Sequence, residues 1–188
     1  MPQPAGLLIT LFTDSSYSHT LRRATWAAWY RADGVTHRQS GALKGRVENS
    51  GEGELGAIAN ALHCIRKTYG QAALAGARII IQADSEEALQ AVERRSHPRA
   101  SAQSIVDYIL DFQSGYAVTL DIRHVKAHVS RAKRTRRNAV NHWCDREAKR
   151  QMGLLLASAE ASAVRMSASA PPSLSSDTVP SDQLALGL

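Results

Sequence analysis

The first forty residues alternate short apolar runs with polar turns, a pattern typical of strands. Residues 7–13 are apolar and rich in β-forming residues and stop at the polar residues 14–16, so they predict a buried strand that ends in a turn. Residues 24–32 predict a second strand, and residues 35–43 predict its hairpin partner because Asp33-Gly34 favours a tight turn. The chain therefore opens with three consecutive strands.

Helical spacing begins after the polar loop at residues 49–51. Apolar residues then recur at intervals of three, four and three, which predicts an amphipathic helix that runs to about Tyr69 and carries Glu54 in its first turn. The apolar stripe consists of Leu55, Ile58, Leu62 and Ile65.

A fourth strand is predicted over residues 78–83, and it stops at an acidic residue, Asp84, as the first strand stops at Asp14. Ser85 is a suitable N-cap for a helix over residues 86–94. Asp14 and Asp84 are therefore both expected at the carboxyl end of a buried strand.

The rest of the chain predicts a helix, a strand and a last helix. The strand covers about residues 117–125, and the last helix covers residues 139–152, with Asn141 and Asp145 one turn apart on the same side. The helix that precedes this strand is marked by the apolar residues Ile105, Tyr108, Ile109 and Phe112. This order predicts an α/β fold, a mixed five-stranded sheet of three antiparallel strands plus two parallel strands, flanked by helices.

Four acidic residues are placed where such a sheet gathers ligands. Asp14 and Asp84 follow strands, beyond whose carboxyl ends open α/β sheets bind ligands, and Glu54 and Asp145 belong to helices. Carboxylates brought together repel one another unless cations offset their charge. Magnesium prefers carboxylate, water and phosphate oxygens, so the quartet predicts a site for two Mg²⁺ ions, with Mn²⁺ as a substitute.

The net charge of +6 and the pI near 9.7 favour a polyanionic partner. The charge is concentrated: residues 123–150 contain ten Lys or Arg and two acids, an excess of 10 − 2 = +8. The rest of the chain is therefore slightly acidic, and a nucleic-acid partner is expected at the basic segment.

Composition changes at Gly153 to mostly Ala, Ser, Leu and Pro, so we expect a catalytic domain over residues 1–152 and a flexible tail over residues 153–188. Cys64 and Cys144 lack metal-binding or redox spacing, which indicates reduced thiols. Residues 1–6 lack a basic region and the apolar run at residues 7–12 is short, so we expect neither a signal peptide nor a membrane span there. We expect a cytoplasmic protein without membrane contact and, by default, a monomer.

Several segments resemble the motifs of the type 1 ribonuclease H family. Thr13-Asp14-Ser15-Ser16 resembles Thr-Asp-Gly-Ser, Glu54-Leu55 resembles the glutamate that opens the first helix, and Ala83-Asp84-Ser85 resembles Thr-Asp-Ser. Val125-Lys126-Ala127-His128 resembles Val-Lys-Gly-His, and residues 141–148 resemble the helix that bears the last acid. The likeness covers roughly residues 7–152, with all four acids in the family's order.

The resemblance implies a magnesium-dependent endonuclease that hydrolyses the RNA strand of RNA–DNA hybrids by two-metal catalysis and leaves 5′-phosphate and 3′-hydroxyl ends. Asp14, Glu54 and Asp84 would be the core metal ligands, and Asp145 a fourth, more loosely held ligand. His128 would assist proton transfer or product release, although a histidine in a basic loop can instead only add phosphate affinity. The alternatives are another nuclease on this fold, such as a junction resolvase or DNA nuclease, and a non-catalytic hybrid-binding module.

Substrate contacts are expected around the acids. Ser15 replaces the family's turn glycine, and the short link at residues 95–100 leaves no room for the basic handle of some members. The long basic loop at residues 129–139 would contact phosphates instead, unless it is only a solvated charge run. Asn141 is either a substrate contact or merely a polar helix residue. The expected substrate contacts are Ser15, Asn49, Ser50, Lys126, Arg131, Lys133, Arg134, Arg136, Arg137 and Asn141.

The C-terminal residues 183–188 resemble the Gln-Leu-x-Leu-type peptide by which bacterial replication proteins bind the sliding clamp. Such a peptide, from Gln183 to Leu188, on a flexible leash would raise the effective concentration of the enzyme at a replication fork. The final aromatic residue of that peptide is missing here, and unrelated tails also contain such strings.

Overall fold

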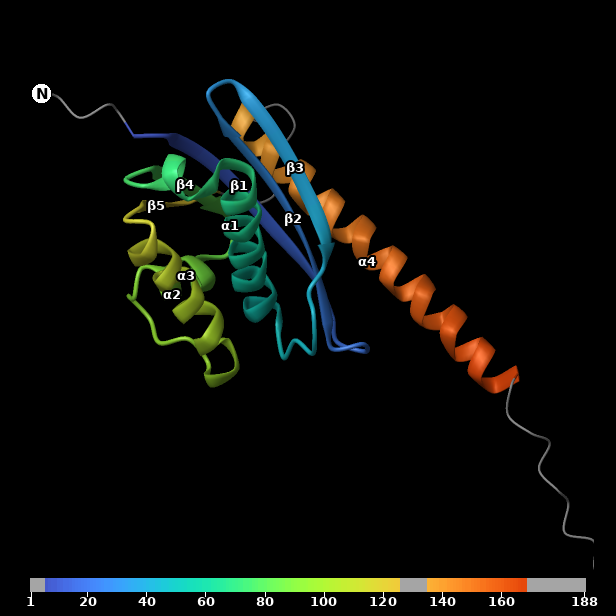
Figure 1. Cartoon of the computed structure of the whole chain (residues 1–188). Helices are drawn as coiled ribbons and strands as arrows, with labels where there is room; N and C mark the ends of the chain where they lie inside the picture. Colours follow the sequence, from blue (N-terminus) through green and yellow to red (C-terminus); the bar gives the residue numbers. More distant parts are fainter. Residues whose placement is uncertain (1–5, 126–134, 169–188) are drawn as a thin grey trace, which may run out of the picture.

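The computed structural model of the protein describes residues 6–125 and 135–168, except for the side chains of Arg136 and residues 166–168. Its centre is a five-stranded sheet with the order β3-β2-β1-β4-β5 (Figure 1). The strands are β1 (Leu8–Ser18), β2 (Arg23–Ala32), β3 (Val35–Ala42), β4 (Arg78–Ala83) and β5 (Thr119–His124). β1, β2 and β3 pair antiparallel, and β4 runs parallel to both β1 and β5. The predicted fold class is confirmed.

Helices cover both faces of the sheet (Figure 1). One face carries α1 (Ser50–Leu74), α2 (Glu86–Val92) and α3 (Gln103–Gly115), and a 3-10 turn, η1 (Ala100–Ala102), precedes α3. α4 (Arg136–Ala168) crosses the other face and projects beyond the sheet.

Alternate residues of β1 supply two separate hydrophobic cores. Leu11 is fully buried with Ile58 and Leu62 on the α1 side, whereas its neighbour Phe12 packs with Cys144 under α4. Side chains alternate between the faces of a strand, so a strand with helices on both sides reads as a continuous apolar run. Burial of each large apolar side chain contributes about 1.5–3 kcal/mol. The strand that carries Asp14 is therefore held firmly from both sides.

β1 is longer than the sequence predicts. The turn expected at residues 14–16 is wrong, because β1 continues through them to Ser18 while β2 pairs with this half of the strand. The parallel pairing with β4 stops at Phe12. Asp14 therefore lies within a paired strand, just beyond the point where β4 separates from it.

The helix starts agree with the capping signals. The predicted N-cap at Ser85 is confirmed, since its hydroxyl accepts a hydrogen bond from the amide three residues on. α1 starts at Ser50, and the Asn49 side chain caps it by accepting a hydrogen bond of 3.0 Å from the Glu52 amide. Glu54, which the sequence places in the first turn, is the fifth residue of α1 and lies at the start of the second turn.

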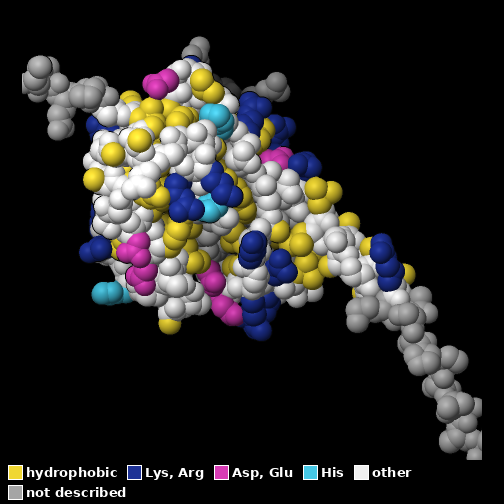
Figure 2. Space-filling model, in the orientation of Figure 1, with side chains coloured by type: hydrophobic (Ala, Val, Ile, Leu, Met, Phe, Trp, Pro, Cys, Tyr) yellow, Lys and Arg dark blue, Asp and Glu magenta, His cyan; other side chains and the backbone are white. Residues whose placement is uncertain are grey.

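α4 continues from its predicted end, Met152, to Ala168. The flexible tail expected from Gly153 is therefore helical as far as the structure describes it. Residues 154–168 contain neither glycine nor proline and are rich in alanine, the strongest helix former. Figure 2 shows apolar and basic side chains on this projecting part. The division into domain and tail stays a prediction.

The predicted clamp peptide, from Gln183 to Leu188, lies outside the described residues. Among the helices that the structure describes, none is long and apolar enough to cross a membrane.

Candidate active site

Three acidic side chains meet where β1, β4 and α1 approach one another. Asp14 comes from β1, Glu54 from the start of the second turn of α1, and Asp84 is the residue that follows β4. One carboxylate oxygen of each lies within 4.8 Å of the others. Asp14 is only 5% exposed, and the other two are half-buried. The structure thus brings together three of the four predicted metal ligands.

Burial and mutual repulsion disfavour the charged forms of these acids. Burial, followed by the charges of Glu54, Asp84 and Asp145, raises the pKa of Asp14 to about 9. Burial also raises the pKa of Glu54 to about 7, and a hydrogen bond from Ser15 limits that rise. A cation held between the carboxylates would reverse this repulsion.

The donor atoms fit a hard divalent cation. All three groups offer oxygen ligands, and Glu54 Oε2 is buried without a hydrogen-bond partner among the described residues. A buried, unpartnered carboxylate oxygen is costly, so an ion that binds it would remove the cost. Magnesium and manganese both suit such an oxygen set.

Asp145 lies near the cluster but outside this group of three oxygens. Lys149 Nζ is 2.6 Å from Asp145 Oδ1, and His142 Nδ1 is 4.0 Å from Asp145 Oδ2. The charge of Asp145 nevertheless contributes to the raised pKa of Asp14. The sequence analysis missed Lys149, although its i,i+4 spacing from Asp145 is a usable signal. Asp145 as a looser fourth ligand stays a prediction.

Ser15, which stands where the family has glycine, contacts the cluster directly. Its hydroxyl donates a 2.7 Å hydrogen bond to Glu54 Oε1. The side chain fits because Gly53 faces it: a Cβ added at Gly53 would lie 3.0 Å from Ser15 Oγ and 3.2 Å from the Ala24 Cβ. Ser15 and Gly53 therefore form a matched pair that orients Glu54.

We expect Ser15→Ala to bind Mg²⁺ about five- to tenfold more weakly than the parent, because a hydrogen bond to a charged group contributes roughly 1.5 kcal/mol and its loss frees Glu54 to rotate. Calorimetric titration measures the affinity, and circular dichroism checks the fold. Ser16→Ala is the matched control, since no described hydrogen bond involves its side chain. Equal affinity in parent and Ser15→Ala would show that the hydrogen bond does not position Glu54.

The structure describes some of the other predicted substrate residues and leaves the rest undescribed. Asn49 uses its Oδ1 as a helix cap, Ser50 is exposed, and Asn141 is buried with an Oδ1 that has no partner among the described residues. Arg137 is exposed and donates a 2.6 Å hydrogen bond to Gln82 Oε1. Outside the described residues, or with an undescribed side chain, are Lys126, His128, Arg131, Lys133, Arg134 and Arg136. All these roles stay predictions.

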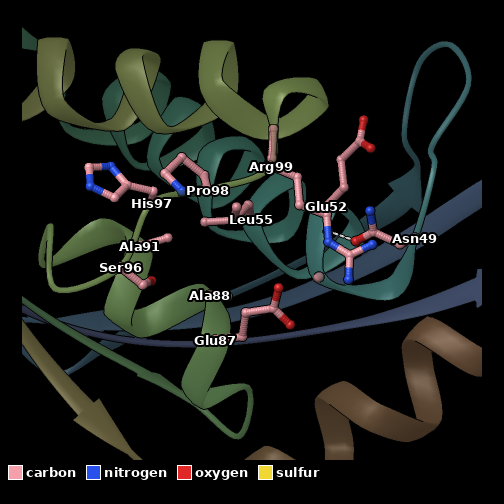
Figure 3. A pocket seen from close by; sticks show the side chains of 12 residues that line it. Asn49, Glu52, Leu55, Glu87, Ala88, Ala91, Ser96, His97, Pro98 and Arg99 are labelled. Carbon is pink, nitrogen blue, oxygen red and sulfur yellow. Dashed lines mark hydrogen bonds between the residues drawn. The ribbon is translucent and has the colours of Figure 1, made fainter.

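A small cavity of about 20 Å³ beside the first turn of α1 adds residues that the sequence patterns did not single out. Figure 3 shows Glu52 and Arg99 near Asn49 at this cavity, which has room for about one water molecule. Glu52 is 8% exposed and accepts a 2.9 Å hydrogen bond from the Glu48 amide. The Asn49-x-x-Glu52 spacing is a capping-box signal that the sequence did contain.

The five-stranded fold and the cluster of three acids together define a nuclease of the ribonuclease H-like class. Residues 8–153 match the model of the RNase H family. The chain therefore belongs to the ribonuclease H family and is a ribonuclease H-type endoribonuclease. The expected family resemblance is confirmed.

Solved structures of low sequence identity share the fold. The N-terminal RNase H domain of rv2228c from Mycobacterium tuberculosis, solved as a fusion with maltose-binding protein, has a TM-score of 0.61 and 16% identity, over 82% of this chain and 99% of that one. RNase H1 from the archaeon Halobacterium salinarum has a TM-score of 0.59 and 14% identity, over 78% and 98% of the two chains.

LC11-RNase H1, isolated from compost by a metagenomic approach and solved with an RNA/DNA hybrid, has a TM-score of 0.61 and 16% identity, over 79% of this chain and 99% of that one. At such identities the likeness shows the fold alone. A search of curated proteins found no match.

Proposed function

We propose that the chain is a magnesium-dependent endonuclease that cuts the RNA strand of RNA–DNA hybrids and leaves 5′-phosphate and 3′-hydroxyl ends. The observation that carries the proposal is the group of carboxylates from Asp14, Glu54 and Asp84, whose oxygens lie within 4.8 Å of one another. Family membership supports the reaction class. The hybrid bound to LC11-RNase H1 supports the choice of substrate.

In this proposal Asp14, Glu54 and Asp84 hold two Mg²⁺ ions, and Asp145 joins them as a weaker ligand. Bound ions would supply the charge that activates an attacking water and stabilises the leaving 3′ oxygen, and Mn²⁺ would substitute. The protein contributes rigid placement: strand pairing holds Asp14, and Ser15 holds Glu54. Lys149, which pairs with Asp145, explains why that ligand would be the looser one.

The substrate strand would lie across the acids and the start of α4. Arg137 and Asn141 occupy the first turns of this helix, where a guanidinium and a side-chain amide can contact phosphate oxygens. His128 would assist proton transfer, and the basic loop before α4 would contact further phosphates. Both roles stay predictions.

Cleavage assays on end-labelled substrates test the proposal. We expect Mg²⁺-dependent cuts in the RNA strand of a matched hybrid, with 3′-hydroxyl ends, and no cuts in double-stranded RNA or a four-way DNA junction. Chelation of the metal should stop the reaction. An intact hybrid beside a cleaved junction or DNA duplex would overturn the proposal in favour of another nuclease on this fold.

A further inference from the structure

An open cavity of about 360 Å³ lies on the sheet face that α4 covers only in part. Strands β1, β2, β4 and β5 form its floor, and the first turns of α4 form one wall. Arg31, Arg123 and Arg137 line it, together with the partly buried ring of Trp29 and the buried amide of Gln82. We call it the arginine cavity.

The described residues that line the arginine cavity carry a surplus of positive charge. Among the described residues, its lining contains three arginines and no acid, whereas the cavities beside α1, α2 and α3 each include at least one glutamate. Arg31 has no ion-pair partner in the part of the chain that the structure describes. Asp121 is close by, but it pairs with Arg78 at 2.7 Å as well as with Arg123 at 2.8 Å. The surplus charge favours an anion.

The arginine cavity lies on the sheet face to which Phe12 and Asp14 of β1 belong. Phe12 and Gln82 border it: Phe12 lies two residues before Asp14 within β1, and Gln82 lies two residues before Asp84, which directly follows β4. Side chains two residues apart in a strand lie on one face and are about 7 Å apart. A nucleic-acid strand that passes the acids can therefore extend over Arg137 into the arginine cavity.

The chemistry of the walls suits a single strand better than a duplex or a small anion. Guanidinium groups bind backbone phosphates, and a partly exposed aromatic ring accepts an unpaired base. We propose that the arginine cavity binds a phosphate in a single-stranded extension of the nucleic acid whose paired part lies at the acids. The identity of that paired part rests on the proposed function; the binding of the extension is measured separately.

The test uses the full-length chain in EDTA, so that binding is observed without cleavage. Fluorescence anisotropy compares a blunt RNA–DNA hybrid with the same hybrid that carries a single-stranded RNA extension at one end or the other. The variant is Arg31→Ala/Arg123→Ala, which leaves Asp121 paired with Arg78. The control, Arg66→Ala/Arg95→Ala, removes the same charge from exposed positions that do not line the arginine cavity.

We expect the variant to bind one extended hybrid roughly tenfold more weakly than the parent, and the slope of its salt dependence to fall by about 0.7 for each phosphate that it no longer neutralises. The affinity of the variant for the blunt hybrid should change by less than about twofold, and so should the affinity of the control variant for every hybrid. Equal binding of extended hybrids by parent and variant would overturn the inference, and so would an equal loss of affinity in the control. A chain that fails to cut any hybrid but shows the expected difference would refute the proposed function alone.

Discussion

Asp14→Asn is expected to abolish cleavage of the hybrid while its binding stays nearly unchanged. The substitution keeps the size of the side chain but removes the charge of the least solvent-exposed acid of the cluster. A metal ion contributes several kcal/mol to a phosphodiester transition state, and about 4 kcal/mol corresponds to roughly a thousandfold in rate. Initial rates on end-labelled hybrid in Mg²⁺ and anisotropy in EDTA measure the two properties.

Asp33→Asn provides the matched control. Asp33 lies exposed in the β2–β3 turn with φ 49°, a conformation that asparagine also tolerates. This variant should cut like the parent. A cleavage rate of Asp14→Asn close to that of the parent would refute the role of the cluster. If parent and Asp14→Asn bound the hybrid equally and neither cut it, the chain would be a hybrid-binding module.

The sequence predicted the placement of the acids because that placement depends on local patterns. Apolar runs that stop at Asp14 and Asp84 mark two strands, and the parallel pairing of β1 with β4 brings the ends of these two apolar runs together. Glu54 follows from helical spacing, and Ser85 follows from capping chemistry. Each signal spans only a few residues, so one sequence suffices to read it.

What the sequence did not predict depends on contacts between distant residues. β1 continues past Asp14 because β2 pairs with its polar half, and no pattern within β1 reveals that pairing. Ser15 appeared only as a departure from the family motif, yet its side chain fits against Gly53 and orients Glu54. Neither contact leaves a periodic signal.

The placement of α4 shows the same limit. The Thr25 hydroxyl donates a 2.7 Å hydrogen bond to the Ala148 carbonyl, and the Ser40 hydroxyl donates one of 2.7 Å to Glu147 Oε1. The Arg150 guanidinium, with further hydrogen bonds, lowers the pKa of Glu147 to about 2, so this carboxylate stays charged and anchored. These contacts fix the helix that carries Asp145 against β2 and β3.

Without a divalent cation, the folded protein is expected to lose stability as the pH rises from about 4 to about 9. Burial and neighbouring carboxylates raise the pKa of Asp14 from 3.8 to about 9 in the folded state. Between these values the folded state keeps a proton that the unfolded chain has released, so a rise in pH favours unfolding. Glu54, whose pKa rises from 4.5 to about 7, adds to the loss of stability over the lower part of this range.

Asp14→Asn should therefore be more stable than the metal-free parent at about pH 8.5, by on the order of 2 kcal/mol, and the difference should shrink towards pH 4. Urea unfolding in EDTA at several pH values measures it, with Asp33→Asn expected to follow the parent. Addition of Mg²⁺ should restore the stability of the parent, because a cation that binds only the folded state stabilises that state by mass action. The same pH dependence in parent and Asp14→Asn would contradict the claim that Asp14 limits stability. The charge that is proposed to hold a metal ion is thus also the charge that is expected to weaken the metal-free fold.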